Sequence, residues 1–375
     1  MAERHPLSVL VVVALSLVTF FPCMLQDADA AYVDVLKTGV QDTLYGVAWK
    51  PDGSEALVVG DHRTVLRYMD ASKEFTRIEY SEGADYLLDA AWRPDSQYAL
   101  VVGSSGAIFA FNGQTLVPYD ANTKEYFYDV NWKADSSEAL LVGSSGMIMR
   151  FKDGSFTKVD SGTTKTLFAS SWRSIDGSAL IVGAAGTVLR LTAEGKVSPI
   201  AFSEKQELFD VAWHPGGTMA LLVGGNGIIA SYDGTDFNFH NKDTLNNFLG
   251  CSWRPGTTTG LICGDTGIII KLKEGRLSWI DVVEIKSPFQ MLEYRPQGDY
   301  LIAVGNLGKA VKYPGTPTSN SPCFLESPLF LAGMTLIGVA LLGAYLASGK
   351  RAAKRKAERD GEPVVHKGHR KKKKR

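Results

Sequence analysis

Residues 208–232, LFDVAWHPGGTMALLVGGNGIIASY, contain the pattern that decides the fold. An apolar run ends at Trp213 and is followed by a Pro-Gly-Gly turn and a second apolar run. The Gly-rich turn GGNG at 224–227 then leads into a third run. Short apolar runs separated by Gly, Pro and Asn are typical of antiparallel strands joined by tight turns. The stretch therefore predicts three consecutive strands of one small sheet.

The same pattern recurs seven times along the chain, with a weaker fourth run such as SFTKVD at 155–160 after the third. An aromatic residue ends the first run of each repeat, and these residues stand 40 to 43 positions apart: Trp49, Trp92, Trp132, Trp172, Trp213, Trp253 and Tyr294. Four short strands per roughly 40 residues is the signature of a propeller blade. We predict an all-β, seven-bladed β-propeller over residues 31–315.

The seventh repeat lacks a fourth run, because it ends at KAVKYPG (309–315). An orphan run, YVDVLK at 32–37, precedes the first repeat. Ring closure removes the exposed strand edges of a sheet. We therefore expect the N-terminal run to complete the last blade.

Two apolar segments flank the predicted propeller. Leu7–Phe21 is followed by Ala28-Asp29-Ala30, which resembles a cleavage site, so we interpret residues 1–30 as a secretory signal peptide. An uncleaved anchor is the alternative. Residues 329–348 (LFLAGMTLIGVALLGAYLAS) contain no charge and are long enough to cross a bilayer as a C-terminal transmembrane helix. A linker at 316–328 joins this predicted single-pass helix to the propeller.

The C-terminal segment, 349–375, is strongly basic, with 13 Lys/Arg against three acidic residues. Positive flanks remain in the cytoplasm, so we expect a cytoplasmic tail and an extracytoplasmic propeller. The tail could contact anionic lipid, with RNA as the rival partner, whereas we expect no nucleic acid at the acidic propeller. Ala340 and Ala344 have the small-xxx-small spacing of helix dimers, which suggests a homodimer.

Cys251 and Cys263 occupy matching positions on the first and second runs of the sixth repeat. Facing side chains on neighbouring antiparallel strands lie close enough for a cross-strand disulfide in an oxidising compartment. Two buried free thiols are the alternative. The repeat alignment would place Val47 opposite Val59 in the first repeat in the same way.

The stretch VAWKPDG…ALVVG…TVLRY resembles the WD-repeat pattern over most of the propeller, without its Gly-His and Trp-Asp signatures. LFDVAW…ALLVGGNGIIASYDG also resembles the extracytoplasmic propellers of photosystem II assembly factors and their bacterial relatives. This resemblance implies a protein partner and a role in assembling membrane complexes.

No metalloprotease, nucleophile-elbow, phosphate-loop or EF-hand motif occurs, so we expect no enzyme, no cofactor and no metal. Asp89, Asp129 and Asp210 each stand three positions before the aromatic residue of a repeat. They could hold a cation or a basic peptide near the mouth of the central channel. The alternative is that each accepts backbone N–H groups from an adjacent turn.

Further candidate binding residues precede the first strands or interrupt the Gly-rich turn of the first repeat. Aromatic side chains on loops suit protein recognition or fill gaps between blades: Tyr45, Tyr86, Tyr126 and Phe127. His62 and Arg63 stand in GDHRTV, where they could reach a ligand or form a longer turn. Together these features favour a membrane-tethered scaffold or assembly factor. The alternative is an extracytoplasmic propeller enzyme or glycan-binding protein.

Overall fold

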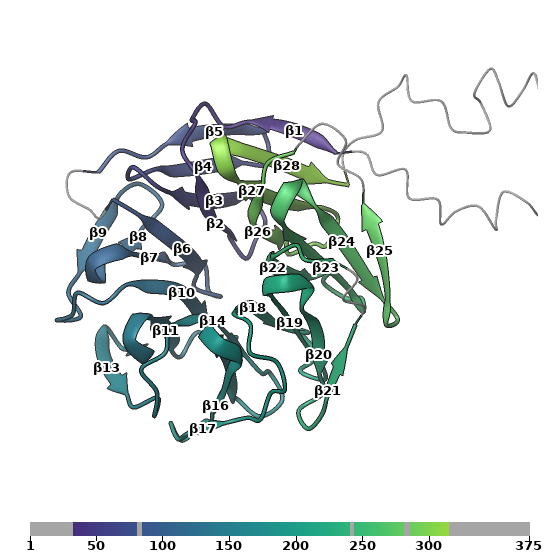
Figure 1. Cartoon of the computed structure of the whole chain (residues 1–375). Coiled ribbons are helices and arrows are strands. Elements are labelled where there is room, and N and C mark those ends of the chain that lie inside the picture. Colours follow the sequence, from purple (N-terminus) through teal and green to yellow (C-terminus); the bar gives the residue numbers. More distant parts are fainter. Residues whose placement is uncertain (1–32, 81–84, 241–243, 281–285, 315–375) are drawn as a thin grey trace, which may run out of the picture. The chain divides into compact units, whose positions relative to one another are not determined.

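The computed structural model describes residues 33–80, 85–240, 244–280 and 286–314. All described strands belong to one compact unit, Met1–Thr316. Seven four-stranded antiparallel sheets are arranged around a central axis, as Figure 1 shows. The prediction of a seven-bladed β-propeller is therefore confirmed.

Each sheet, or blade, runs from an inner strand beside the axis to an outer strand at the rim. The inner strands contact one another around the ring: β2 (Leu44–Trp49), β6 (Leu87–Trp92), β10 (Phe127–Trp132), β14 (Leu167–Trp172), β18 (Leu208–Trp213), β22 (Phe248–Trp253) and β26 (Phe289–Tyr294). The second strands are β3 (Glu55–Gly60), β7 (Ala99–Gly103), β11 (Ala139–Gly143), β15 (Ala179–Gly183), β19 (Ala220–Gly224), β23 (Thr259–Gly264) and β27 (Leu301–Gly305).

The third strands are β4 (Val65–Met69), β8 (Ile108–Phe111), β12 (Ile148–Lys152), β16 (Thr187–Leu191), β20 (Ile229–Tyr232), β24 (Ile269–Lys273) and β28 (Lys309–Tyr313). The outer strands are β5 (Glu74–Arg77), β9 (Leu116–Tyr119), β13 (Ser155–Val159), β17 (Val197–Pro199), β21 (Phe237–Phe239), β25 (Arg276–Ile280) and β1 (Asp34–Lys37). Short 3₁₀ turns follow the second strands of blades two to seven: η1 (Ser104–Gly106), η2 (Ser144–Gly146), η3 (Ala184–Gly186), η4 (Gly225–Gly227), η5 (Asp265–Gly267) and η6 (Asn306–Gly308).

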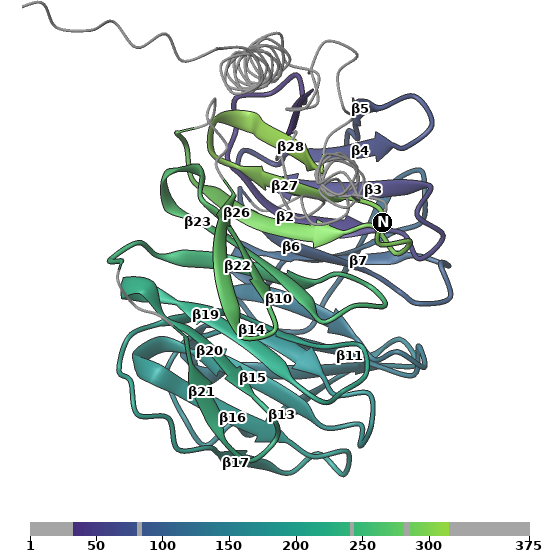
Figure 2. The same ribbon diagram turned by 90° about the vertical axis from the view of Figure 1, so that its right-hand side faces the viewer.

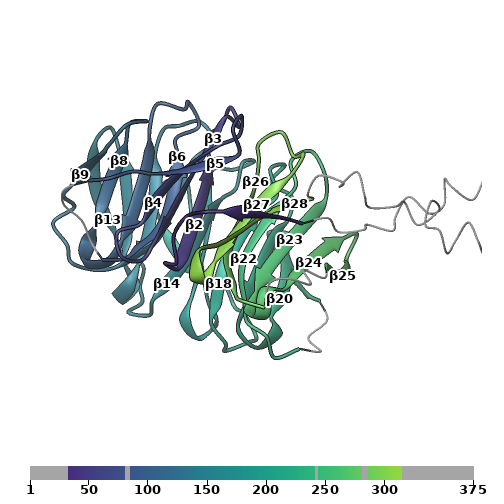
Figure 3. The ribbon, with the colours of Figure 1, turned by 90° about the horizontal axis from the view of Figure 1, so that it is seen from above.

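The N-terminal strand closes the ring as predicted. Strand β1 pairs antiparallel with β28, with Asp34 opposite Lys312 and Lys37 opposite Lys309. Figure 3 shows the purple β1 beside β28. The Thr38 hydroxyl donates a buried 2.7 Å hydrogen bond to the Gly308 carbonyl. The two ends of the propeller are thus joined within a single sheet.

Every inner strand carries a β-bulge near its start. In blade one the register shifts between Leu44 and Gly46, so that Tyr45 is the extra residue, and the same shift occurs in the other six blades. The backbone that leads into the bulge packs against a glycine that ends the second strand. A Cβ atom on Gly143 would lie 1.9 Å from the Tyr126 carbonyl oxygen, which explains why this place in each repeat holds glycine.

The bulge corrects the predicted register by one residue. Cys251 lies opposite Ile262 and Cys263 lies opposite Gly250, so the two cysteines are not cross-strand partners. Both are buried free thiols, which is the alternative to the proposed disulfide. Val47 likewise lies opposite Val58 rather than Val59.

The hydrophobic core lies between the blades and is divided into clusters, each of which joins adjacent sheets. One cluster contains Leu57 and Val59 from blade one with Leu87 and Trp92 from blade two. Figure 2 shows the strands of successive blades lying one beside the next. Because each face of a blade packs on its neighbour, the strands read as continuous apolar runs rather than as alternating ones.

Cationic side chains add a second link between blades. The residue after the aromatic of one blade lies over the aromatic ring of the next, as Arg173 lies over Trp213 with its guanidinium carbon 4.6 Å from the ring centre. Arg173 Nε also donates a 2.8 Å hydrogen bond to the Gly217 carbonyl of that blade. Lys50, Arg93 and Lys133 lie over Trp92, Trp132 and Trp172 in the same way.

The predicted signal peptide, transmembrane helix and basic tail lie outside the described residues. Within the described part of the chain, no helix has the length and apolar character needed to cross a membrane.

Candidate functional site

The central channel contains the candidate site, because the inner strands bring polar residues from all parts of the sequence to its walls. Asp89, Asp129 and Asp210, which we call the carboxylate ring, line two cavities at once. One cavity, of about 90 Å³, lies toward the starts of the inner strands. The other, of about 260 Å³, lies toward their ends. The structure therefore brings the three predicted aspartates together.

Each aspartate of the carboxylate ring joins its own blade to the next. Asp89 accepts a 3.0 Å hydrogen bond from the backbone N–H of Val130, and Asp210 accepts one of 2.7 Å from that of Cys251. Asp129 accepts hydrogen bonds from both the N–H and the hydroxyl of Ser170. An inner strand has no sheet neighbour on its channel side, so its N–H groups need such acceptors. These donors belong to the neighbouring inner strand, and Asp210 also accepts from the Val211 N–H of its own strand. We expected the donors to lie in an adjacent turn, and this expectation is corrected.

Burial dominates the electrostatics of the channel. Desolvation raises the pKa of Asp89 to about 7 and that of Asp210 to about 6. Desolvation, followed by the nearby charge of Asp89, raises the pKa of Asp129 well above its usual range. The carboxylate ring therefore holds protons at a pH where exposed aspartates are ionised.

Glu293 is a fourth channel acid, which was not predicted from the sequence. Its carboxylate accepts a 2.7 Å hydrogen bond from the Trp49 N–H, which links the inner strands of blades seven and one. Burial raises its pKa to about 8. Ser171 and Ser252 stand at the same place in their repeats, and their hydroxyls accept from the N–H groups of Trp213 and Tyr294. In the sequence, these three residues could have been found by their shared position, directly before the aromatic residue of a repeat.

Above the carboxylate ring, the seven bulge residues form a collar around the smaller cavity. The collar comprises Tyr45, Leu88, Tyr128, Phe168, Phe209, Leu249 and Gln290. Its members are partly exposed, and neighbouring rings touch: the Tyr128 and Phe168 centroids are 5.4 Å apart, and those of Phe168 and Phe209 are 5.7 Å apart. Of these residues, only Tyr45 was predicted from the sequence to bind a partner. Two consecutive large residues at the start of each first run, such as LF at 208–209, were the signal of a bulge.

The other predicted aromatic residues divide into two groups. Tyr86 is 44% exposed and Tyr126 is 39% exposed, and the Tyr126 and Tyr128 rings lie 6.3 Å apart beside the collar. Phe127, in contrast, is fully buried. The bulge turns the next residue, Tyr128, toward the channel and leaves Phe127 in the core, so the expectation that Phe127 is an exposed binding residue is wrong.

His62 and Arg63 form the turn of blade one. Both have left-handed backbone conformations, with φ of 48° and 61°. The Arg63 guanidinium donates a 3.0 Å hydrogen bond to the Tyr80 carbonyl and lies over the Tyr80 ring. His62 points instead toward two carboxylates, those of Asp42 and Asp61. The turn interpretation holds for the backbone of both residues.

Seven closed blades around an acid-lined channel with an apolar collar define this chain as a seven-bladed β-propeller. The comparison with solved structures agrees: 1654 chains match its fold. One of them, described as YCF48 bound to D1 peptide, has a TM-score of 0.64 and 14% sequence identity, over 77% of this chain and 96% of that chain. No family model matches the sequence, and no curated protein matches it either.

Proposed function

We propose that this chain is a protein-binding propeller that receives an apolar segment of a partner protein at the collar. The collar carries the proposal: six of its seven side chains are aromatic or aliphatic, and all seven lie partly exposed around one mouth of the channel. Aromatic clusters on rigid scaffolds are typical of interaction sites. The exposed rings of Tyr86 and Tyr126 extend this surface outward.

The comparison supports a protein segment as the ligand. The similar propeller YCF48 was solved with a D1 peptide, so this fold can hold a protein segment. The predicted signal peptide and apolar segment 329–348 support the finer proposal of an extracytoplasmic scaffold or assembly factor tethered beside a membrane complex. The partner is then a membrane or extracytoplasmic protein.

The test is affinity purification from intact membranes with a paired set of variants. Phe168→Ser/Phe209→Ser should lose a stoichiometric protein partner that the unaltered chain retains. Ile175→Ser is the matched control, because Ile175 is an apolar residue, 59% exposed, in the turn at the opposite ends of the inner strands. Equal partner recovery with both variants would overturn the proposal, as would recovery of bound glycan alone.

A further inference from the structure

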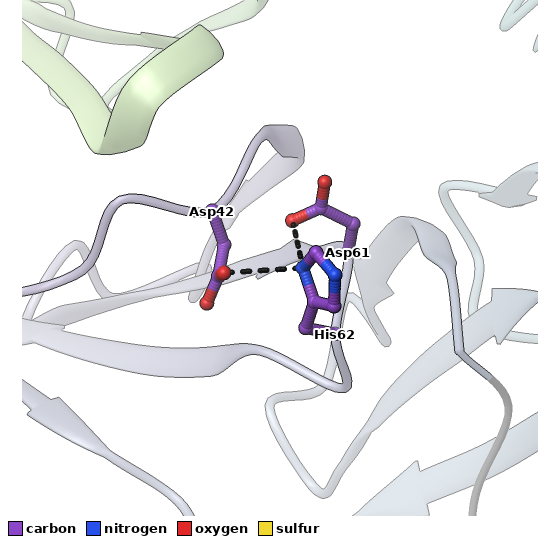
Figure 4. Close-up of side chains that lie close together, drawn as sticks. All are labelled: Asp42, Asp61 and His62. Atoms are coloured by element: carbon purple, nitrogen blue, oxygen red, sulfur yellow. Dashed lines mark ion pairs between the residues drawn. The ribbon is translucent and has the colours of Figure 1, made fainter.

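Three potential metal ligands meet at the beginning of blade one. Asp42 precedes strand β2, and Asp61 and His62 follow strand β3. His62 Nδ1 lies 3.2 Å from Asp42 Oδ1 and 3.4 Å from Asp61 Oδ1. The three ligand atoms all lie within 4.8 Å of one another. Figure 4 shows that the Nδ1 side of the ring faces both carboxylates.

The two distances from His62 Nδ1 fit a tetrahedral zinc site. Zinc binds imidazole nitrogen and carboxylate oxygen at about 2.0–2.2 Å, so neighbouring ligand atoms in a tetrahedron stand about 3.3 Å apart. The two distances to His62 Nδ1 lie on either side of this value. Mixed imidazole and carboxylate ligands favour zinc and related transition metals over calcium and magnesium, which prefer oxygen.

The Asp61 carboxylate is the most buried of the three side chains. Its Oδ1 atom is buried, and no residue in the described ranges forms a hydrogen bond with it. The Asp61 backbone is fixed on both sides, since its N–H donates to the Thr43 carbonyl and its carbonyl accepts from Thr64. Its near neighbour is His62 Nδ1 at 3.4 Å, and a bound cation would give this buried oxygen the close partner that a carboxylate in a protein interior needs.

Asp42 is oriented in the manner of a metal ligand. Its Oδ2 atom accepts a 2.5 Å hydrogen bond from the Thr64 hydroxyl, which leaves Oδ1 directed at His62. Hydrogen bonds to the second oxygen of a ligating carboxylate are a regular feature of metal sites. His62 has the left-handed backbone conformation that the matching residue adopts in every other blade, where its place is taken by Ser105, Ser145, Ala185, Asn226, Thr266 and Leu307.

The local charge admits a divalent ion. Arg77 Nη1 lies 3.8 Å from Asp42 Oδ2 and offsets one of the two carboxylate charges. Arg63 is directed away, toward Tyr80. We propose that Asp42, Asp61 and His62 bind a zinc-class divalent ion with an open fourth position. The side chain of His62 is 78% exposed, so solvent or another ligand can reach that position.

The experiment uses the full chain, freed of metal by a chelator, with Zn²⁺ added in a calorimeter and Co²⁺ followed by visible absorption. One site should bind Zn²⁺, and Co²⁺ should give the intense bands of tetrahedral coordination. His62→Ala and Asp42→Asn should each abolish this site. Arg77→Gln should tighten binding, because it removes the competing positive charge.

The control is His214→Gln, since His214 lies in blade five and its Nε2 contacts the Thr257 carbonyl. This variant should bind Zn²⁺ like the unaltered chain, and circular dichroism should show that all variants keep the fold. Binding that survives His62→Ala would belong to other histidines, such as His366 or His369, and would overturn the proposal. Absence of binding would also overturn it.

Discussion

Asp129 on the inner strand of blade three accepts two hydrogen bonds from Ser170 on the inner strand of blade four, 3.1 Å from its backbone N–H and 2.6 Å from its hydroxyl. No backbone hydrogen bond of a β-sheet joins these two inner strands, because they belong to different sheets. The aspartate thus replaces the missing sheet partner on the channel side of the strand. Asp89 and Asp210 repeat the arrangement one blade before and two blades after.

Replacing Asp129 with alanine should lower the free energy of unfolding by about 1–3 kcal/mol, because the buried N–H of Ser170 loses its acceptor. Asp129→Asn is the matched variant, since its amide oxygen can still accept both hydrogen bonds. Urea denaturation of the two variants measures the difference. Equal loss in both would show that the charge, rather than the acceptor, stabilises the contact between these blades.

The raised pKa values of the channel acids predict a dependence of stability on pH. Asp89 has a pKa of about 7 and Asp210 of about 6 in the folded chain, against about 3.9 when unfolded. Between these values the folded chain holds protons that the unfolded chain has released, so stability falls as pH rises from about 4 to about 7. Asp89→Asn/Asp129→Asn/Asp210→Asn should flatten this part of the profile.

The measurement is the urea midpoint of both proteins at several pH values from 4 to 8. Above pH 7 the triple variant should be at least as stable as the unaltered chain, because it no longer buries the charges of the carboxylate ring. An identical slope in both proteins would contradict the assignment of these protons to the carboxylate ring.

Ring closure by β1 predicts that substitutions at two neighbouring residues have different effects on the melting temperature. Leu36 packs against the core cluster that contains Trp49 and Tyr68, whereas Val35 points outward and is 48% exposed. Leu36→Asp should therefore lower the melting temperature by several degrees, since it places a charge against the core. Val35→Asp on the other face should leave it nearly unchanged. Equal effects would indicate that β1 does not close the ring in this register.

The repeat allowed the number of blades and the closing strand at 32–37 to be predicted, because both follow from apolar runs and turns at a regular spacing. The register within a blade could not be predicted in the same way. An alignment of the repeats shows which residues are equivalent to Cys251 and Phe127. It does not show the bulge, which changes the residues that these two face. A bulge adds one residue without changing the order of apolar and polar segments.

The site was predictable only where a residue type repeats at one place. Asp89, Asp129 and Asp210 share a position, so their convergence could be foreseen, but the acceptor role depends on N–H groups about 40 residues away. The group of Asp42, Asp61 and His62 has no motif spacing, because a whole hairpin separates its first ligand from the others. Such contacts become visible only in three dimensions.

The cationic links between blades predict that arginine and lysine are not interchangeable at residue 173. The Arg173 guanidinium lies over Trp213, donates to the Gly217 carbonyl through Nε, and donates to the Asp233 carbonyl at 3.2 Å through Nη2. Lysine cannot form these bonds together, because its ammonium is a single point. Arg173→Lys should lower the free energy of unfolding by about 1–2 kcal/mol.

The matched change is Lys133→Arg at the same place in blade three, over Trp172. It should leave stability unchanged or raise it, and urea denaturation of both variants is the measurement. Loss of stability in Lys133→Arg equal to that in Arg173→Lys would show that these cations do not link the blades.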